Sequence, residues 1–111
     1  MNSKIKIAAT EALQKLQHSN KEFISLFNHG TLEVEIYKPD KIDNQKPHDK
    51  DEVYVVISGS GNFYCNGQTV SFTHGDFLFV PAHAEHRFLN FTNDFSIWVF
   101  FYGKKGGEAD L

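Results

Sequence analysis

The sequence predicts an all-β domain, a sandwich or barrel of short strands, with one short helix near its N-terminus. Short segments rich in Val, Ile, Phe and Tyr follow one another along most of the chain. Turn signals separate them, and the clearest is Asn66-Gly67, where both turn positions favour a positive φ angle. The 111 residues have room for one hydrophobic core, and eleven Phe residues supply its bulk. We therefore divide the chain into an N-terminal segment, residues 1–21, and a single β-domain, residues 22–111.

The N-terminal segment contains a predicted helix from Ala8 to Gln17. Thr10 is its expected N-cap residue, and apolar residues follow at helical spacing. Two strands, Glu22 to Phe27 and Leu32 to Lys38, are expected on either side of a turn at Asn28-His29-Gly30. In the second strand apolar residues alternate with two glutamates, which predicts one dry face and one face in water.

The remaining strands follow a polar loop, Pro39 to Pro47. They are expected at Val53 to Ile57, Asn62 to Cys65, Gln68 to Phe72, Phe77 to Val80, His86 to Phe91 and Phe95 to Tyr102. The last of these strands is apolar on both faces, so one face must be covered by something other than the barrel interior. We expect a homodimer in which a second copy covers it. The alternative is a cover within the chain, made by the helix and the hairpin of residues 22–38.

Composition excludes several classes of partner. The net charge is −3, and Arg87 is the only Lys or Arg between Asp51 and Gly103. A protein that binds nucleic acid needs a basic surface to neutralise phosphates, so that role is not expected. No apolar run approaches the roughly twenty residues that span a bilayer, so we expect no membrane role. Cys65 is the single cysteine, which excludes an intrachain disulfide and favours a cytoplasmic setting.

Two short segments carry a candidate metal site. His48 and Glu52 are an even number of positions apart, so in a strand their side chains point to the same face. His86 opens another strand after a turn that contains proline. If it faces the same interior, two imidazoles and one carboxylate form a set suited to Fe(II), Mn(II), Ni(II) or Zn(II), with positions open for water or substrate. Each residue also has an alternative role without a metal. His48 could be a solvated loop residue, Glu52 could shield the edge of the sheet, and His86 could cap a turn.

The spacing around these residues resembles the two sequence motifs of the cupin superfamily. His48, Glu52 and Gly59 stand at the positions of the second His, the Glu and the Gly of the first motif. The second motif is matched in register by Gly75, Pro81, His86 and Asn90. The resemblance spans residues 22–108 and implies a small single-domain cupin of the conserved-barrel type. Its fold would be a jelly-roll (double-stranded β-helix) barrel, with His48, Glu52 and His86 holding one divalent metal ion.

Two positions depart from the cupin pattern. Lys46 stands where the first motif has its first His, and a protonated ammonium has no lone pair for a metal. The family's four-ligand site is thus reduced to three, with Lys46 free to pair with Glu52 or to bind an anionic substrate. Gln45 is the neighbour that could offer a carbonyl oxygen. His83 stands in place of a Gly, and we expect it at the surface of its turn.

Other side chains are assigned from the parity of their strands. Tyr54 shares the face of His48 and Glu52, and Phe88 shares the face of His86, so both are expected to line the pocket or to fill the barrel. Asp51 and Glu85 are expected to be solvated.

These residues predict a metal-binding protein that handles a small molecule. We favour a metalloenzyme of the dioxygenase, isomerase or lyase type, with a two-His-one-Glu site. A non-catalytic barrel that binds or senses a small ligand is the alternative, and a barrel that has lost its metal is a third reading, because the cupin fold hosts enzymes and non-enzymes alike.

Overall fold

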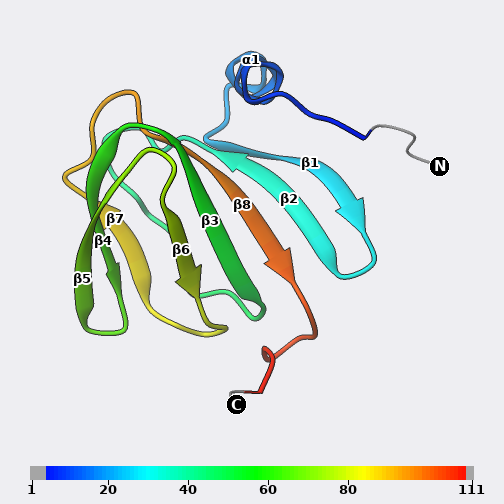
Figure 1. Ribbon diagram of the computed structural model, residues 1–111, viewed down its shortest axis with the longest axis vertical. Helices are drawn as coiled ribbons and strands as arrows, with labels where there is room; N and C mark the ends of the chain where they lie inside the picture. Colours follow the sequence, from blue (N-terminus) through cyan, green and yellow to red (C-terminus); the bar gives the residue numbers. More distant parts are fainter. Residues whose placement is uncertain (1–4, 110–111) are drawn as a thin grey trace.

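The computed structural model describes residues 5–109, which form one helix and eight strands (Figure 1). The helix, α1, spans Ala9–Ser19. The strands are β1 (Phe23–His29), β2 (Leu32–Tyr37), β3 (Asp51–Ser58), β4 (Ser60–Cys65), β5 (Gln68–Thr73), β6 (Phe77–Val80), β7 (His86–Leu89) and β8 (Ser96–Tyr102). The described helix is too short and too polar to cross a membrane.

The strands form two antiparallel sheets that face each other. The larger sheet has the order β1-β2-β8-β3-β6, and the smaller one has the order β5-β4-β7. From β3 onward the chain crosses between the sheets repeatedly, so that β6 and β8 join the larger sheet and β7 joins the smaller one (Figure 1). This is the jelly-roll barrel that the resemblance to cupins implies.

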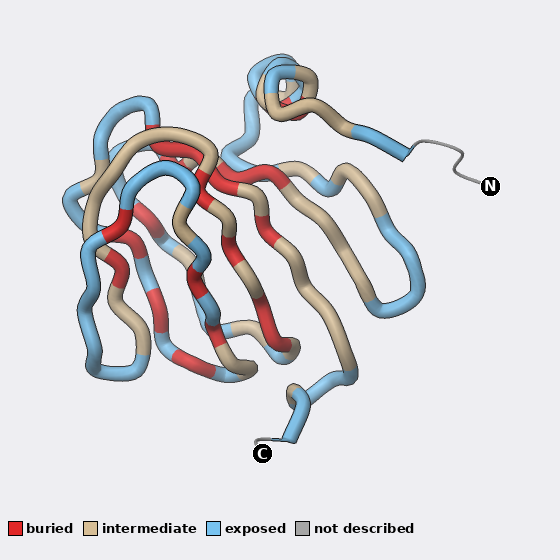
Figure 2. The backbone as a smooth tube through the Cα atoms, viewed as in Figure 1, coloured by how far each residue is buried: buried red, intermediate tan, exposed pale blue. Residues whose placement is uncertain are grey.

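The main core lies between the two sheets. Strands that face it alternate between buried and exposed residues, as β6 and β7 show (Figure 2). Its buried members are Tyr37, Tyr54, Val56, Phe63, Phe72, Leu78, Val80, Ala84, Phe88, Phe95, Ile97 and Val99. Phe88 is at the centre of an aromatic cluster, with ring centroids 4.8–5.5 Å from those of Phe63, Phe72 and Phe95.

The N-cap residue of the helix lies two positions before the predicted one. Ala8 is the N-cap residue, with an extended backbone, and its carbonyl oxygen accepts the first helical hydrogen bond from the Ala12 N–H at 3.0 Å. The prediction of Thr10 as N-cap is therefore wrong, because Thr10 already has helical geometry. Ala12 and Leu16 are buried against Ile36 of β2.

The hairpin formed by β1 and β2 differs from the prediction in its faces. Strand β1 continues to His29, so the turn lies at Gly30 and Thr31, where Gly30 has φ +59°. In β2 the apolar Ile36 points outward and packs under α1. The alternate face, which carries Glu35, lines a cavity inside the barrel. The expectation that the glutamates face bulk water is wrong at Glu35, because the dry face of this strand is supplied by the helix instead of the barrel.

Candidate metal centre

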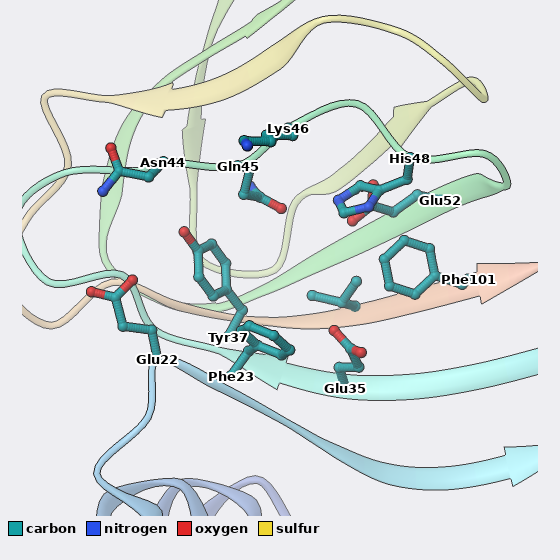
Figure 3. Close-up of a pocket in the computed structure, with 11 residues that line it drawn as sticks. Glu22, Phe23, Glu35, Tyr37, Asn44, Gln45, Lys46, His48, Glu52 and Phe101 are labelled. Atoms are coloured by element: carbon teal, nitrogen blue, oxygen red, sulfur yellow. The ribbon is translucent and has the colours of Figure 1, made fainter.

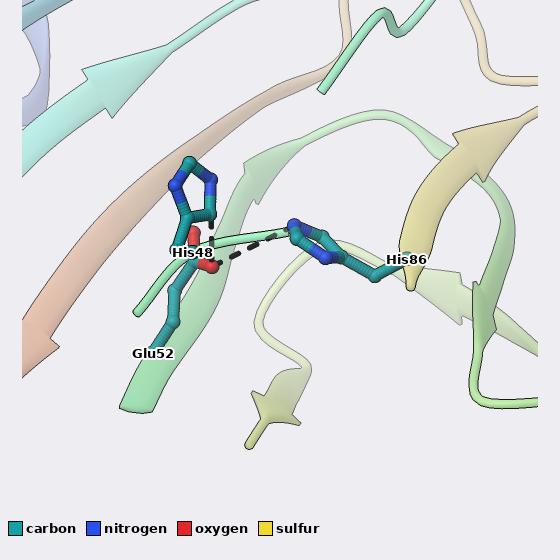
Figure 4. A group of neighbouring side chains, drawn as sticks. All are labelled: His48, Glu52 and His86. Atoms are coloured by element: carbon teal, nitrogen blue, oxygen red, sulfur yellow. Dashed lines mark ion pairs between the residues drawn. The ribbon is translucent and has the colours of Figure 1, made fainter. Parts of the chain in front are cut away.

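Three different segments bring the predicted ligands together (Figure 4). His48 lies in the loop that precedes β3, Glu52 is the second residue of β3, and His86 is the first residue of β7. One ligand atom from each of the three lies within 4.8 Å of the others. Glu52 Oε1 is 3.6 Å from His86 Nε2 and 4.0 Å from His48 Nε2. The parity of β3 and β7 thus does direct Glu52 and His86 to one interior.

The ligand atoms are buried and have no hydrogen-bond partners among the described residues. This holds for His48 Nε2, for both carboxylate oxygens of Glu52 and for His86 Nε2. Buried polar atoms are nearly always paired, so four such atoms that converge on one point indicate a missing partner. A divalent cation would satisfy all of them, since imidazole nitrogens and carboxylate oxygens are the ligands that Fe, Mn, Ni and Zn accept.

The second ring nitrogen of His86 fixes the form of that ligand. His86 Nδ1 lies 2.9 Å from the carbonyl oxygen of Ala84, which can only accept a hydrogen bond. In the neutral ring Nδ1 therefore carries the proton, and Nε2 presents its lone pair to Glu52 and His48. The ring of His48 is held by an edge contact with Phe101, at a centroid distance of 5.0 Å.

The electrostatics of the centre favour a cation. Burial raises the pKa of Glu52 to about 8; the Tyr54 hydroxyl acts against this rise, and the charges of Glu35 and Asp43 add to it. Burial also lowers the pKa of His48, with a further contribution from His86. The His48 imidazole is thus held in its neutral form, which can bind a metal. The ionised form of Glu52 has no positive charge beside it, and a bound cation would stabilise that form.

The loop that carries His48 is fastened by a buried aspartate that the sequence analysis did not identify. Asp43 Oδ1 accepts hydrogen bonds from the Tyr37 hydroxyl at 2.7 Å and from the Gln45 backbone N–H at 3.0 Å. Its Oδ2 accepts from the Gln45 amide at 3.0 Å and from the Phe88 backbone N–H at 2.8 Å. One carboxylate thereby joins the loop of residues 38–50 to β2 and to β7, the strand that begins with His86.

A second set of contacts joins the two ligand segments directly. The His83 N–H donates to the carbonyl oxygen of His48 at 2.6 Å. Asp51 accepts from the Ala82 N–H at 2.9 Å and from the Glu108 N–H at 2.7 Å. The expectation that Asp51 is solvated is therefore wrong, because its carboxylate is the buried acceptor for two backbone segments. Glu85 is exposed as expected. His83 is exposed too, with φ +69°.

A cavity of about 370 Å³ opens beside His48 and Glu52, two of the three candidate ligands (Figure 3). It is lined by Glu22, Phe23, Glu35, Tyr37, Asn44, Gln45, Lys46, His48, Glu52, Val99 and Phe101. Of the predicted pocket residues, Gln45 and Lys46 are in this wall. Tyr54 lies beneath it, fully buried, and its hydroxyl donates to Gln45 Oε1 at 3.2 Å. Phe88 is not in the wall, since it fills the aromatic core below.

The wall contains residues that sequence reasoning missed, above all Glu35, Tyr37 and Phe23. They come from β1 and β2, which the sequence places far from His48. Lys46 lies across the cavity from these residues of β1 and β2. Among the described residues, no ion pair joins Lys46 to Glu52. Of the two roles expected for Lys46, the pairing with Glu52 is therefore not made.

Comparison with known proteins gives the family. The family model for the cupin domain matches residues 32–102. Uncharacterized protein SCO3923 from Streptomyces coelicolor is 31% identical over 81 residues, which cover 71% of this chain and 77% of that protein. Among solved structures, the conserved SPY1581 protein of unknown function from Streptococcus pyogenes is similar with a TM-score of 0.64 and 13% identity, over 94% of this chain and 92% of that one. The DMSP lyase DddQ from Ruegeria pomeroyi is similar with a TM-score of 0.61 and 22% identity, over 73% of this chain and 46% of that one. The family match covers both ligand segments and the strands that carry them, and the chain belongs to the cupin family.

Proposed function

We propose that this cupin binds one divalent metal ion through His48, Glu52 and His86 and uses it to act on a small molecule in the adjoining cavity. The observation that carries the proposal is the convergence of four buried, unpaired ligand atoms. A purely structural role does not account for them, because leaving such atoms unpaired destabilises the fold.

The expected metal is Fe(II), Mn(II), Ni(II) or Zn(II). When bound, such an ion supplies a Lewis acid for a substrate oxygen or lowers the pKa of a water molecule. Three protein ligands leave positions open for both. The chain's own residues orient the substrate: Phe101 and Val99 form an apolar wall, and Gln45 offers an amide that Asp43 and Tyr54 hold in place.

Catalysis is favoured over binding alone by the position of the cavity, which reaches both the ligands and the surface. The DMSP lyase DddQ is a structurally similar protein, so this fold is known to support catalysis. A non-catalytic barrel is the second candidate, because Lys46 removes one imidazole from the usual ligand set.

Two measurements test the proposal. Elemental analysis of protein purified without an affinity tag should find about one metal ion per chain, and that ion should be one of the four metals named above. Turnover of a metabolite panel, under air and under nitrogen, then separates an enzyme from a binding module and an oxygenase from an isomerase or lyase. Metal without turnover of any panel member would favour the binding barrel, and protein that takes up no metal would overturn the proposed site.

Restoring the missing imidazole should strengthen the centre. Lys46→His is expected to tighten metal binding by on the order of one to a few kcal/mol, as for one good ligand added to a preformed shell. Calorimetric titration of the stripped protein measures the gain. Asn44→His, which places an imidazole elsewhere in the same cavity wall, is the control. An unchanged affinity in a folded Lys46→His variant would mean that position 46 does not face the metal.

The outer face of the larger sheet supports a homodimer. The registers of β6, β3, β8 and β2 align two apolar rows across this face: Phe79, Val53, Phe100 and Val34, and Phe77, Val55, Trp98 and Ile36. The helix covers Ile36 and part of Trp98, and Ile24 and Leu26 of β1 pack in the same cluster, but Phe77 and Phe79 are not part of it. Phe77 and Phe79 remain 64% and 45% exposed, so the cover within the chain is incomplete.

A second copy packed against this face is therefore part of the proposal, and sedimentation equilibrium tests it. The wild-type chain should have a dimer mass at tens of micromolar protein. Phe79→Glu should shift it to a monomer, because a carboxylate cannot be buried in that face unpaired. Val70→Glu changes a similarly exposed residue on the other sheet and should leave the dimer intact. A monomer mass for the wild type would contradict the dimer.

A further inference from the structure

Glu35 is a carboxylate that the proposed metal centre does not use. It lies on the inner face of β2, half-buried, in the wall of the cavity. Figure 3 shows its carboxylate pointing into the cavity between Phe23 and Phe101, with His48 and Glu52 on the opposite side.

Glu35 has no partner of opposite charge. Among residues 5–109 its carboxylate makes no hydrogen bond and no ion pair, and the charged neighbour that acts on it is another carboxylate, Glu33. Burial raises the pKa of Glu35 to about 7, and Glu33 adds to that effect. The other carboxylates of this region are engaged: Glu22 accepts from the Asp40 N–H, and Asp43 fastens the loop. Glu35 is thus the cavity carboxylate left for a ligand.

The surroundings of Glu35 suit a positive charge. The rings of Phe23, Tyr37 and Phe101 are in the same wall, and aromatic faces attract an ammonium group. Lys46, the one Lys or Arg of this wall, is on the opposite side and is exposed to solvent. Strand β8 separates β2 from β3, so the backbones that carry Glu35 and Glu52 are about 10 Å apart. A molecule of a few carbon atoms bridges the two groups.

We propose that the cavity binds a small organic cation, whose ammonium group pairs with Glu35 while its other end faces the His48, Glu52 and His86 group. Only the placement of the second end rests on the proposed function. Glu35 is then the residue that selects substrates by charge.

Three probes of equal length and different charge test this inference. They are 3-amino-1-propanol (cation), 1,3-propanediol (neutral) and 3-hydroxypropanoate (anion), titrated into the protein with and without Zn²⁺ and followed through the backbone amide signals of β2 and β8. The amine should bind at least about fivefold more tightly than the diol. Glu35→Gln should abolish that preference. Glu33→Gln removes the same charge from the same strand outside the cavity wall and should preserve it.

Each other outcome contradicts the inference. An amine preference that survives Glu35→Gln, a tighter binding of the anion, or no shift of these signals by the amine would overturn it. Glu35→Gln should unfold at the wild-type temperature or above, because it removes an unpaired charge, so loss of the fold does not obscure the result. Metal uptake is measured in parallel. Protein that takes up no metal but keeps the Glu35-dependent preference refutes the proposed function and leaves this inference standing.

Discussion

His86→Ala and His48→Ala should each abolish tight metal binding. Each substitution removes one of three protein ligands, and the remaining imidazole and carboxylate cannot hold a transition metal tightly in competition with water. Losing an outer partner of a ligand already weakens metal binding by about ten- to a hundredfold, so losing a ligand should exceed a hundredfold. Titration of stripped protein against a chelating dye measures the change. Glu52→Ala should weaken binding less predictably, because a water molecule can occupy the vacated carboxylate position.

His83→Asn is the matched control for both variants. His83 belongs to the turn before β7 and its N–H bonds the His48 carbonyl, but its side chain is exposed and outside the ligand group. Asn tolerates the positive φ angle at this position, so the turn should survive. The control should therefore bind metal like the wild type. If His86→Ala and His48→Ala also did so, the ion would have to lie elsewhere.

Most strands and the turn at Asn66-Gly67 could be predicted because their signals are local. Asn66 and Gly67 have φ angles of +49° and +85°, as the turn chemistry requires, and the strands on either side pair from Cys65↔Gln68 onward. Glu52 and His86 point to the same interior because each is placed by the parity of its own strand. Periodicity needs only a few neighbouring residues, and those residues are adjacent in the sequence.

The cavity wall and the loop anchor could not be predicted in this way. Whether the polar face of β2 points to water or into the barrel depends on α1 covering its other face, which is a tertiary contact. The role of Asp43 depends on Phe88, which is 45 positions away, and on a loop without periodicity. A buried aspartate in a polar loop has the same sequence signature as a solvated one.

Asp43→Ala should destabilise the protein and loosen the metal centre at once. The substitution removes four hydrogen bonds and leaves the Phe88 N–H and the Tyr37 hydroxyl without an acceptor inside the protein. Hydrogen bonds to a charged acceptor contribute about 1.5–3 kcal/mol each but are not additive within one network, so we expect a loss of about 3 kcal/mol. For a domain of this size that lowers the unfolding temperature by about 10–15 °C. Scanning calorimetry of metal-free protein measures the loss.

The same variant separates the roles of the loop and of the ligands. Asp40→Ala is the control, because Asp40 is an exposed acidic residue of the same loop, and its unfolding temperature should stay close to that of the wild type. In Asp43→Ala the segment that carries Gln45 and His48 loses its attachment to β7, so metal affinity should also fall by about tenfold, as for other outer-shell partners of a ligand. Asp43→Asn keeps one acceptor oxygen but turns an amide toward a donor, and an intermediate effect is expected. If Asp43→Ala were destabilised while its metal affinity stayed at the wild-type value, Asp43 would support the fold without positioning His48.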